Sequence, residues 1–192
     1  MEDDLGLVER VRAGDETAFA HLVHRHQPPL LRLAEATVGS RAVAEEVCQD
    51  TWLAVLRGVE RFEGRSSFKT WLFRIMLNRA RTSAGREQRA GRPHDQVEHF
   101  DASGAWAEPP VPWSDRVDDR LVAEHLARRV RALLPELPEQ QRQVVVLRDV
   151  EGLGPADVAS LLGVSDGHQR VLLHRGRARL RALLAVEMGS DR

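Results

Sequence analysis

One segment near the middle of this 192-residue chain has no regular apolar spacing and divides the sequence in two. Between Gly91 and Asp119 the chain contains four prolines together with Gly, Ser and scattered acidic residues. Proline interrupts helices and central strands, and neither the period of two nor the period of about 3.6 residues runs through the segment. We therefore predict a flexible acidic linker at residues 91–118, between small domains at 1–90 and 119–187.

Three aromatic residues, Phe100, Trp106 and Trp113, lie within this predicted linker. A passive spacer does not need large apolar side chains, which bury much surface where they dock. Two interpretations have equal weight: the linker docks on another surface, or these side chains complete the core of one of the domains.

The first half of the chain has the apolar spacing of amphipathic helices, in steps of three and four residues. Gly14 and Asp15 indicate a break, and the pair Pro28–Pro29 is expected to open a new helix. A helix is predicted over 40–59, with Ser40 as its N-cap. Its expected apolar side consists of Val43, Val47, Thr51, Leu53, Ala54 and Leu56.

A loop is predicted at residues 62–67, followed by a helix that begins near Phe68 and continues through Asn78 and Arg81. No strand-like alternation of useful length occurs in either half of the sequence. Aromatic residues make up only 5% of the chain and Tyr is absent, which argues against an all-β fold. The fold class predicted from these patterns is all-α.

The second half contains the signature of a helix-turn-helix. Pro155 occupies the first position expected of one helix, Gly163 ends it, and Ser165 can cap a second helix running to about Val186. The small Ala159 allows the two helices to approach. On the second helix the apolar face and the basic face are opposite one another. The apolar face contains Leu172, Gly176, Leu180 and Leu183, and the basic face contains Arg170, His174, Arg177 and Arg181.

The near-neutral net charge of -1 hides a strong separation of charge along the chain. Residues 61–92 contain nine Lys or Arg against two Asp or Glu, and residues 165–192 contain six against three. Residues 93–119 contain seven acidic residues and a single arginine. Two basic blocks on folded helices favour contact with a polyanion at two places. The alternative is that these blocks are ordinary solvated faces.

Several other classes of protein are disfavoured. A single cysteine, Cys48, cannot form an internal disulfide, and we expect it to be a small buried residue. No apolar run is long enough to span a bilayer and no secretory signal is visible, so we expect a cytoplasmic protein without membrane insertion. His21, His24 and His26 lack a nearby Cys or carboxylate to complete a metal site. No motif for catalysis is present, so neither a cofactor nor an enzyme activity is expected.

Five segments, in order along the chain, resemble bacterial RNA polymerase sigma factors of the extracytoplasmic-function (ECF) subgroup. Members of this family have two helical domains, called region 2 and region 4, joined by a linker. Region 2 is resembled by AEEVCQDTWL (44–53) and FEGRSSFKTWLFRI (62–75), and region 4 by LPELPEQQR (134–142), VLRDVEGL (146–153) and HRGRARL (174–180). The resemblance implies promoter-specific initiation of transcription, with RNA polymerase core and promoter DNA as partners and an anti-sigma factor as a further one.

The resemblance implies that core polymerase, through its beta and beta-prime subunits, binds the helix of residues 40–59. The implied residues have spacings of three and four, so they form a polar stripe that can face the helices of a partner. They are Glu45, Glu46, Gln49, Asp50 and Trp52. Without the rest of the pattern, a solvated acidic face would be the preferred interpretation.

The resemblance also implies that a base of the -10 promoter element is captured beside the loop at residues 63–67. Aromatic faces and cations are what single-strand capture requires, and Phe62, Phe68, Trp71 and Phe73 lie nearby. Some of these aromatics must instead form the core, and the periodicity favours an inward position for Phe68 and Trp71. The candidate -10 residues are Arg61, Arg65, Ser66, Lys69, Trp71, Arg74, Asn78, Arg79 and Arg81.

Region 4 is implied to bind the -35 element as duplex DNA through the second helix of the helix-turn-helix. A basic stripe there suits phosphates and guanine edges in a major groove. The candidate residues are His168, Gln169, Arg170, His174, Arg177 and Arg181. The sequence departs from the family pattern after Gly163, where Gln169 occupies a position that is normally apolar. Either Gln169 faces DNA or the helix is slightly rotated.

Two other classes of function remain open. A transcriptional repressor or activator would use the helix-turn-helix alone, which leaves the aromatic and basic segment 61–81 unexplained. An anti-sigma-type protein or scaffold would explain the acidic helix but neither basic block. The dependence of DNA binding on core polymerase distinguishes these classes.

Overall fold

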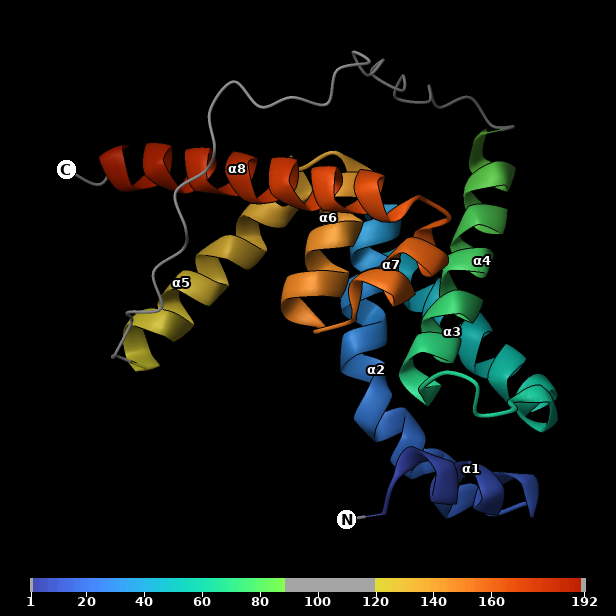
Figure 1. Cartoon of the computed structure of the whole chain (residues 1–192). Helices are drawn as coiled ribbons and strands as arrows, with labels where there is room; N and C mark the ends of the chain where they lie inside the picture. The colour runs from blue at the N-terminus through green and yellow to red at the C-terminus, as the bar shows by residue number, and fades with distance from the viewer. Residues whose placement is uncertain (1, 89–119, 191–192) are drawn as a thin grey trace.

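The computed structural model describes residues 2–88 and 120–190, with side chains described for 2–82 and 127–187. The predicted linker at residues 91–118, including Phe100, Trp106 and Trp113, lies outside the described residues. The described residues form helices and no strands, which confirms the all-α class. The helices before the gap are called the N-terminal unit and those after it the C-terminal unit (Figure 1).

The N-terminal unit begins with two helices separated by the predicted break. Gly14 has a φ of +86°, and the carboxylate of Asp15 accepts hydrogen bonds from the N–H groups of Thr17 and Ala18, at 2.9 and 3.1 Å. Asp15 therefore caps the second helix and satisfies donors that have no partner within it. The unit consists of α1 (Asp4–Arg12), α2 (Glu16–Val38), α3 (Arg41–Gly58), the short 3-10 turn η1 (Val59–Arg61) and α4 (Phe68–Gln88).

The expectation that Pro28–Pro29 opens a new helix is wrong, because α2 runs through both prolines without interruption. A proline inside a helix removes one backbone hydrogen bond and crowds the preceding turn. Packing compensates for this cost, since buried side chains follow one face of α2 from before the prolines to well after them. These buried residues are Ala18, Leu22, His26, Leu30, Leu33, Ala34 and Ala36.

The C-terminal unit consists of α5 (Arg120–Leu133), the 3-10 turn η2 (Leu134–Glu136), α6 (Glu139–Val145), the π-helical turn η3 (Val146–Val150), α7 (Pro155–Leu162) and α8 (Asp166–Ser190). Gly163 has a φ of +70° and follows α7, where a left-handed residue ends the helix. The hydroxyl of Ser165 accepts a hydrogen bond from the N–H of His168 at 3.2 Å. The predicted helix-turn-helix is thus confirmed as α7 and α8.

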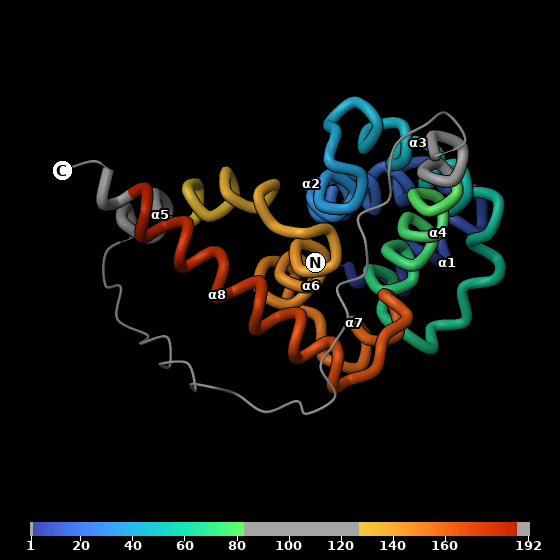
Figure 2. Tube along the Cα trace, turned by 90° about the horizontal axis from the view of Figure 1, so that it is seen from above, coloured from blue at the N-terminus to red at the C-terminus, as the bar shows by residue number. Residues whose placement is uncertain are grey.

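The two units pack against one another in the described part of the chain. Helix α2 contacts α6 and η3, and α4 contacts α7. Figure 2 shows α6 and α7 lying between α8 and the helices of the N-terminal unit. The buried apolar side chains form one continuous cluster that includes Phe68 and Leu72 from one unit and Leu147 and Leu161 from the other.

Candidate nucleic-acid and polymerase interface

The polar stripe of α3 lies on the surface of the N-terminal unit. Glu45, Glu46, Gln49 and Asp50 are exposed, as the prediction of a partner-binding face requires. Trp52 is different: only 8% of this residue is exposed, and its indole N–H donates to Oε1 of Gln27 at 2.6 Å. Trp52 therefore belongs to the core, so its predicted place on the stripe is wrong.

Two leucines of α3 were expected on the apolar side of the helix but lie on its surface. Leu53 is 50% exposed and Leu56 is 47% exposed. They extend the stripe by one turn beyond Asp50, because residues three and four apart share a helix face. The sequence signal was available: two leucines follow the acidic stripe at its own spacing. The exposed face of α3 is therefore acidic at one end and apolar at the other.

The aromatic residues around the loop mostly form a packed cluster. The rings of Phe62, Phe68 and Trp71 lie 5.2 to 5.8 Å from one another, centre to centre. Phe62, Phe68 and Phe73 are buried, whereas Trp71 is half-buried. Flat stacking on a base requires an accessible ring face. Of the four aromatics considered, only Trp71 has surface to offer.

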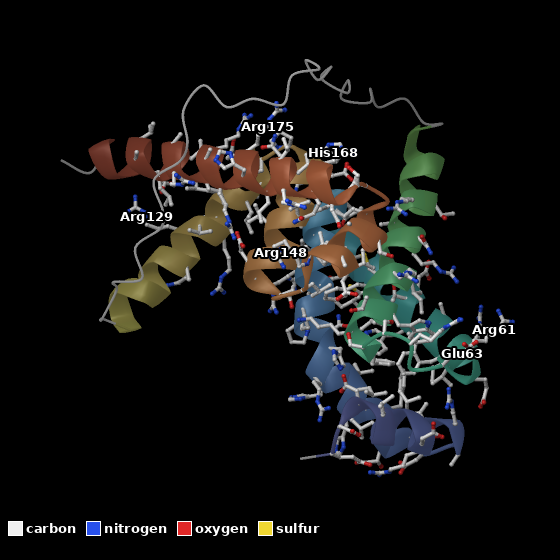
Figure 3. The ribbon with its side chains drawn as sticks, in the orientation of Figure 1. Arg61, Glu63, Arg129, Arg148, His168 and Arg175 are labelled. Carbon is white, nitrogen blue, oxygen red and sulfur yellow. The ribbon has the colours of Figure 1, made fainter. Side chains whose placement is uncertain are left out.

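The exposed -10 candidates lie at the end of η1, in the loop and on α4. Arg61, Arg65, Asn78 and Arg79 are exposed, and Arg65 pairs with Glu63 at 3.0 Å. Ser66 is half-buried. Figure 3 shows Arg61 and Glu63 at the outer edge of the N-terminal unit, far from α8.

Three other -10 candidates contact the C-terminal unit. Nζ of Lys69 lies 2.7 Å from Oε2 of Glu151, and Arg74 donates to the hydroxyl of Ser160 at 2.9 Å. The guanidinium of Arg81 donates to the carbonyl oxygen of Leu161 at 3.2 Å. The structure therefore places Lys69, Arg74 and Arg81 in contact with the other unit, although Arg74 and Arg81 remain exposed. The other six candidates are exposed or half-buried.

The two faces of α8 are as the sequence predicts, and one close contact holds the helix in place. A Cβ at Gly176 would lie 2.8 Å from Cγ2 of Val145 and 3.3 Å from the carbonyl oxygen of Gln141. Only glycine allows α6 and α8 to approach this closely. The opposite face contains exposed Arg170, Arg177 and Arg181.

The polar residues of the -35 face have different surroundings. Arg177 pairs with Asp149 through Nε at 2.9 Å, and this hydrogen-bonded pairing raises the pKa of Arg177. Desolvation lowers the pKa of His174, and the nearby charges of Arg181 and Arg177 lower it further. His168 and His174 are half-buried. Figure 3 shows His168 and Arg175 along the outer side of α8.

Gln169 does not lie on the DNA-facing side, so its prediction as a -35 contact is wrong. Only 1% of Gln169 is exposed, and its side-chain nitrogen has no hydrogen-bond partner among the described atoms. It occupies the buried face together with Leu172 and Leu173. The helix is therefore not rotated to expose Gln169. An exposed arginine that the site prediction omitted, Arg179, lies on the outer side, and its signal was its place in the HRGRARL segment.

The described side chains contain no group of three His, Cys, Asp or Glu placed to hold a metal ion. His26 is buried, and its Nε2 lies 2.9 Å from Oδ2 of Asp4. His21 and His24 are exposed. Among the described residues, no helix is both long enough and apolar enough to cross a membrane.

Comparison with known proteins agrees with this arrangement. The family Sigma-70 region 2 matches residues 22–90, and the family Sigma-70, region 4 matches residues 127–180. The ECF RNA polymerase sigma-E factor of Haemophilus influenzae is 32% identical over 177 residues, which cover 91% of each chain. The chain therefore belongs to the ECF sigma factors, which direct promoter-specific initiation of transcription with RNA polymerase.

Two solved structures have the same fold. The structure of CnrH in complex with the cytosolic domain of CnrY is 27% identical, with a TM-score of 0.61, and covers 96% of this chain and 97% of that one. The sigma factor RpoE of Bartonella quintana, solved with the anti-sigma factor NepR, is 24% identical with a TM-score of 0.63. It covers 88% of this chain and 97% of its own chain.

Proposed function

We propose that three surfaces of this chain divide the work of promoter recognition. The exposed face of α3 binds core polymerase, the loop and α4 bind the -10 element, and α8 binds the -35 element as duplex. The observation that carries the proposal is the outward row of arginines on α8, within a helix-turn-helix and on the same chain as an acidic helix face. Arginine pairs with phosphates and with guanine edges in the major groove.

At the -10 element, Trp71 provides the accessible ring and Asn78 a group that can read a base edge. Arg61, Arg65 and Arg79 are exposed and Ser66 is half-buried, and their donors suit a single-stranded backbone. Domain limits of 1–90 and 119–187 agree with this division. The chain itself needs no catalytic residue in this function, because it selects the promoter and leaves nucleotide chemistry to the polymerase.

Two further assignments follow from the function. A protein that acts with RNA polymerase on chromosomal DNA works in the bacterial cytoplasm. An anti-sigma factor is a suitable regulatory partner, since a related chain has been solved with one. Such a partner would compete with polymerase for the exposed face of α3, or with DNA for the surface of α4.

Transcription in vitro with core polymerase and genomic promoter fragments tests the proposal. The free protein should bind duplex DNA weakly at physiological salt, because acidic segments oppose the basic ones, and binding should become specific when core is added. Tight sequence-specific binding without core would instead favour a repressor or activator. Failure to bind any promoter fragment even with core would favour an anti-sigma-type protein.

The α3 assignment has its own test. Combining Gln49→Ala with Asp50→Lys should weaken association with core polymerase and leave the helical content unchanged. Glu136→Lys is the control, because it reverses an exposed charge that belongs to the C-terminal unit and not to α3. Wild-type affinity in the double variant would show that core does not bind this face.

A further inference from the structure

The carboxylate of Glu151 is buried between cations of the other unit. Only 2% of its side chain is exposed. Nε of Arg32, from α2, donates to Oε1 at 2.8 Å, and Nζ of Lys69, from α4, lies 2.7 Å from Oε2. Lys69 also donates to the backbone oxygen of Glu151 at 2.9 Å. One residue at the end of η3 therefore joins the C-terminal unit to two helices of the N-terminal unit.

A second contact between the units lies at the end of α2. Nε of Arg142, from α6, donates to the carbonyl oxygen of Ala36 at 2.6 Å. The same guanidinium donates to the carbonyl oxygens of Pro135 and Leu137 within its own unit. A cation at a helix C-terminus satisfies carbonyls that have no partner within the helix and interacts favourably with the helix dipole.

These contacts involve three cations of α4, the helix that the proposed function assigns to -10 DNA. Lys69, Arg74 and Arg81 each contact the C-terminal unit, through Glu151, Ser160 and the carbonyl of Leu161 respectively. A carboxylate and a phosphate both offer anionic oxygens to the same donors. While the units are docked, these three donors face protein groups in place of a DNA backbone.

We propose that the docked arrangement is an autoinhibited state of the chain, held closed by Glu151, in which the C-terminal unit competes with -10 DNA for Lys69, Arg74 and Arg81. The inference rests on the proposed function for the identity of the competitor, but the closed state itself rests only on the contacts. Removing one partner of a buried ion pair leaves uncompensated charge, so loss of Glu151 favours separation of the units. Separation then frees all three donors at once.

The composition of the chain provides a direct probe of this state. Lys69 is the only lysine in the sequence, so an amine-reactive reagent has one side-chain target. Acetylation of Lys69 by an N-hydroxysuccinimide ester, followed by mass spectrometry of the peptide that contains it, measures how often the amine is accessible. In the full-length wild-type protein this reaction should be slow, because the ammonium group is paired and only 28% of the side chain is exposed.

Two variants test whether closure controls this accessibility. Glu151→Gln removes the charge that pairs with Lys69, and Arg142→Met removes the contact with Ala36 without touching Lys69. Each should raise the acetylation rate by about tenfold or more, because each shifts a two-state equilibrium toward separated units. Glu136→Gln, which neutralises an exposed glutamate of the same unit, should leave the rate unchanged.

Circular dichroism must show wild-type helicity in each variant before the rates are compared. If Glu151→Gln raises the rate and Arg142→Met, equally helical, does not, the change is local to the ion pair and the closed state is refuted. If neither variant raises it, the proposal is also wrong. Because Arg142 has contacts within its own unit, Arg81→Ala provides a second remote variant, with the same expected increase.

The same acetylation experiment with added DNA tests the closed state and the proposed function separately. A single-stranded oligonucleotide of mixed sequence, mixed with the Glu151→Gln protein, should slow acetylation of Lys69 again. Rapid acetylation in the presence of the oligonucleotide would remove Lys69 from the -10 surface and contradict that part of the proposed function. The closed state would stand in that case, since the first two variants test it without DNA.

Discussion

The two basic helices of this protein, α4 and α8, differ in what their cations contact. On α4, Lys69, Arg74 and Arg81 meet groups of the other unit. On α8, Arg170 and Arg181 are exposed, and Arg177 pairs with Asp149 of its own unit. The two helices have similar charge in the sequence, yet three cations of α4 bond groups of the other unit, whereas Arg170, Arg177 and Arg181 of α8 are exposed.

This difference shows that a basic block identifies a surface suited to a polyanion but not whether the surface is free. The charge of a segment follows from its own sequence, whereas the accessibility of its side chains depends on contacts with residues far apart in the chain. Glu151 and Arg32 are 119 positions apart, and Arg142 and Ala36 are 106 positions apart. The predictions below test this contrast between α4 and α8.

The largest effect is expected from breaking the contact that holds α8 in place. Gly176→Val would force a side chain into Val145 and the backbone of Gln141, and overpacking of this kind costs about 1–3 kcal/mol. Gly167→Val, on the same helix but in open space, is the matched control. Chemical denaturation should show a lower free energy of unfolding for the first variant only. Equal stabilities would contradict the close approach of α6 and α8.

The next effect concerns DNA affinity in the presence of core polymerase. Arg170→Ala should weaken binding to a duplex -35 probe by about 1–3 kcal/mol if the arginine reads a base with two hydrogen bonds. Arg177→Ala should cost less, because Arg177 must first leave Asp149. Fluorescence anisotropy measures both, with Arg128→Ala as an exposed control on another helix.

Asn78→Ala on α4 should give the opposite pattern. It should change the preference for -10 bases and slow open-complex formation, with little effect on the duplex -35 probe. Comparing intact promoter with a template already mismatched across the -10 region isolates this step. Loss of duplex -35 binding in Asn78→Ala, or unchanged binding in both arginine variants, would mean that α4 and α8 do not divide the promoter as proposed.

A smaller effect is expected at the buried face of α8. Gln169→Leu replaces a buried amide, whose nitrogen lacks a described partner, with an apolar side chain of similar size. Relief of an unsatisfied buried polar group should stabilise the protein by about 1 kcal/mol. Binding to the duplex -35 probe should not change. Gln140→Leu, at an exposed position, serves as the control, and a loss of -35 affinity in Gln169→Leu would return this residue to the DNA face.

The smallest effect concerns pH. The pKa of His174 is lowered in the folded protein, so the unfolded chain binds more protons as the pH falls below the ordinary value of 6.5. This residue therefore destabilises the fold at lower pH. In His174→Gln, the drop in melting temperature between about pH 7.5 and about pH 5.5 should be smaller than in wild type. In the control variant His24→Gln, at an exposed position, the drop in melting temperature should equal that of wild type.

Local signals in the sequence predicted much of the fold. Asp15, Pro155, Gly163 and Ser165 have the roles expected of residues that begin or end helices. The opposite faces of α8 also follow from spacing alone. The errors arose where packing outweighs a local preference, as at Pro28–Pro29, where a continuous buried face keeps α2 intact.

The candidate surfaces were harder to predict than the helices. Trp52 and Gln169 were expected at the surface, but both side chains are buried in the core. Leu53 and Leu56 show the reverse error, because they were expected on the apolar side of the helix but are exposed. The pairing of Lys69 with Glu151 has no sequence signal, because it depends on how two distant segments dock. Spacing can show which residues share a helix face, but tertiary contacts determine whether that face packs against protein or is exposed to solvent.

The cap on the last turn of α2 has a consequence for local motion. Arg142 belongs to the C-terminal unit, yet it bonds the carbonyl oxygen of Ala36 near the end of that helix. Helix ends fray most easily where their terminal groups lack partners. When the units separate, the final turn before Gly39 loses this bond, and we expect its amides to exchange with solvent deuterium faster. The end of α2 would then report, residue by residue, on a rearrangement of the whole molecule.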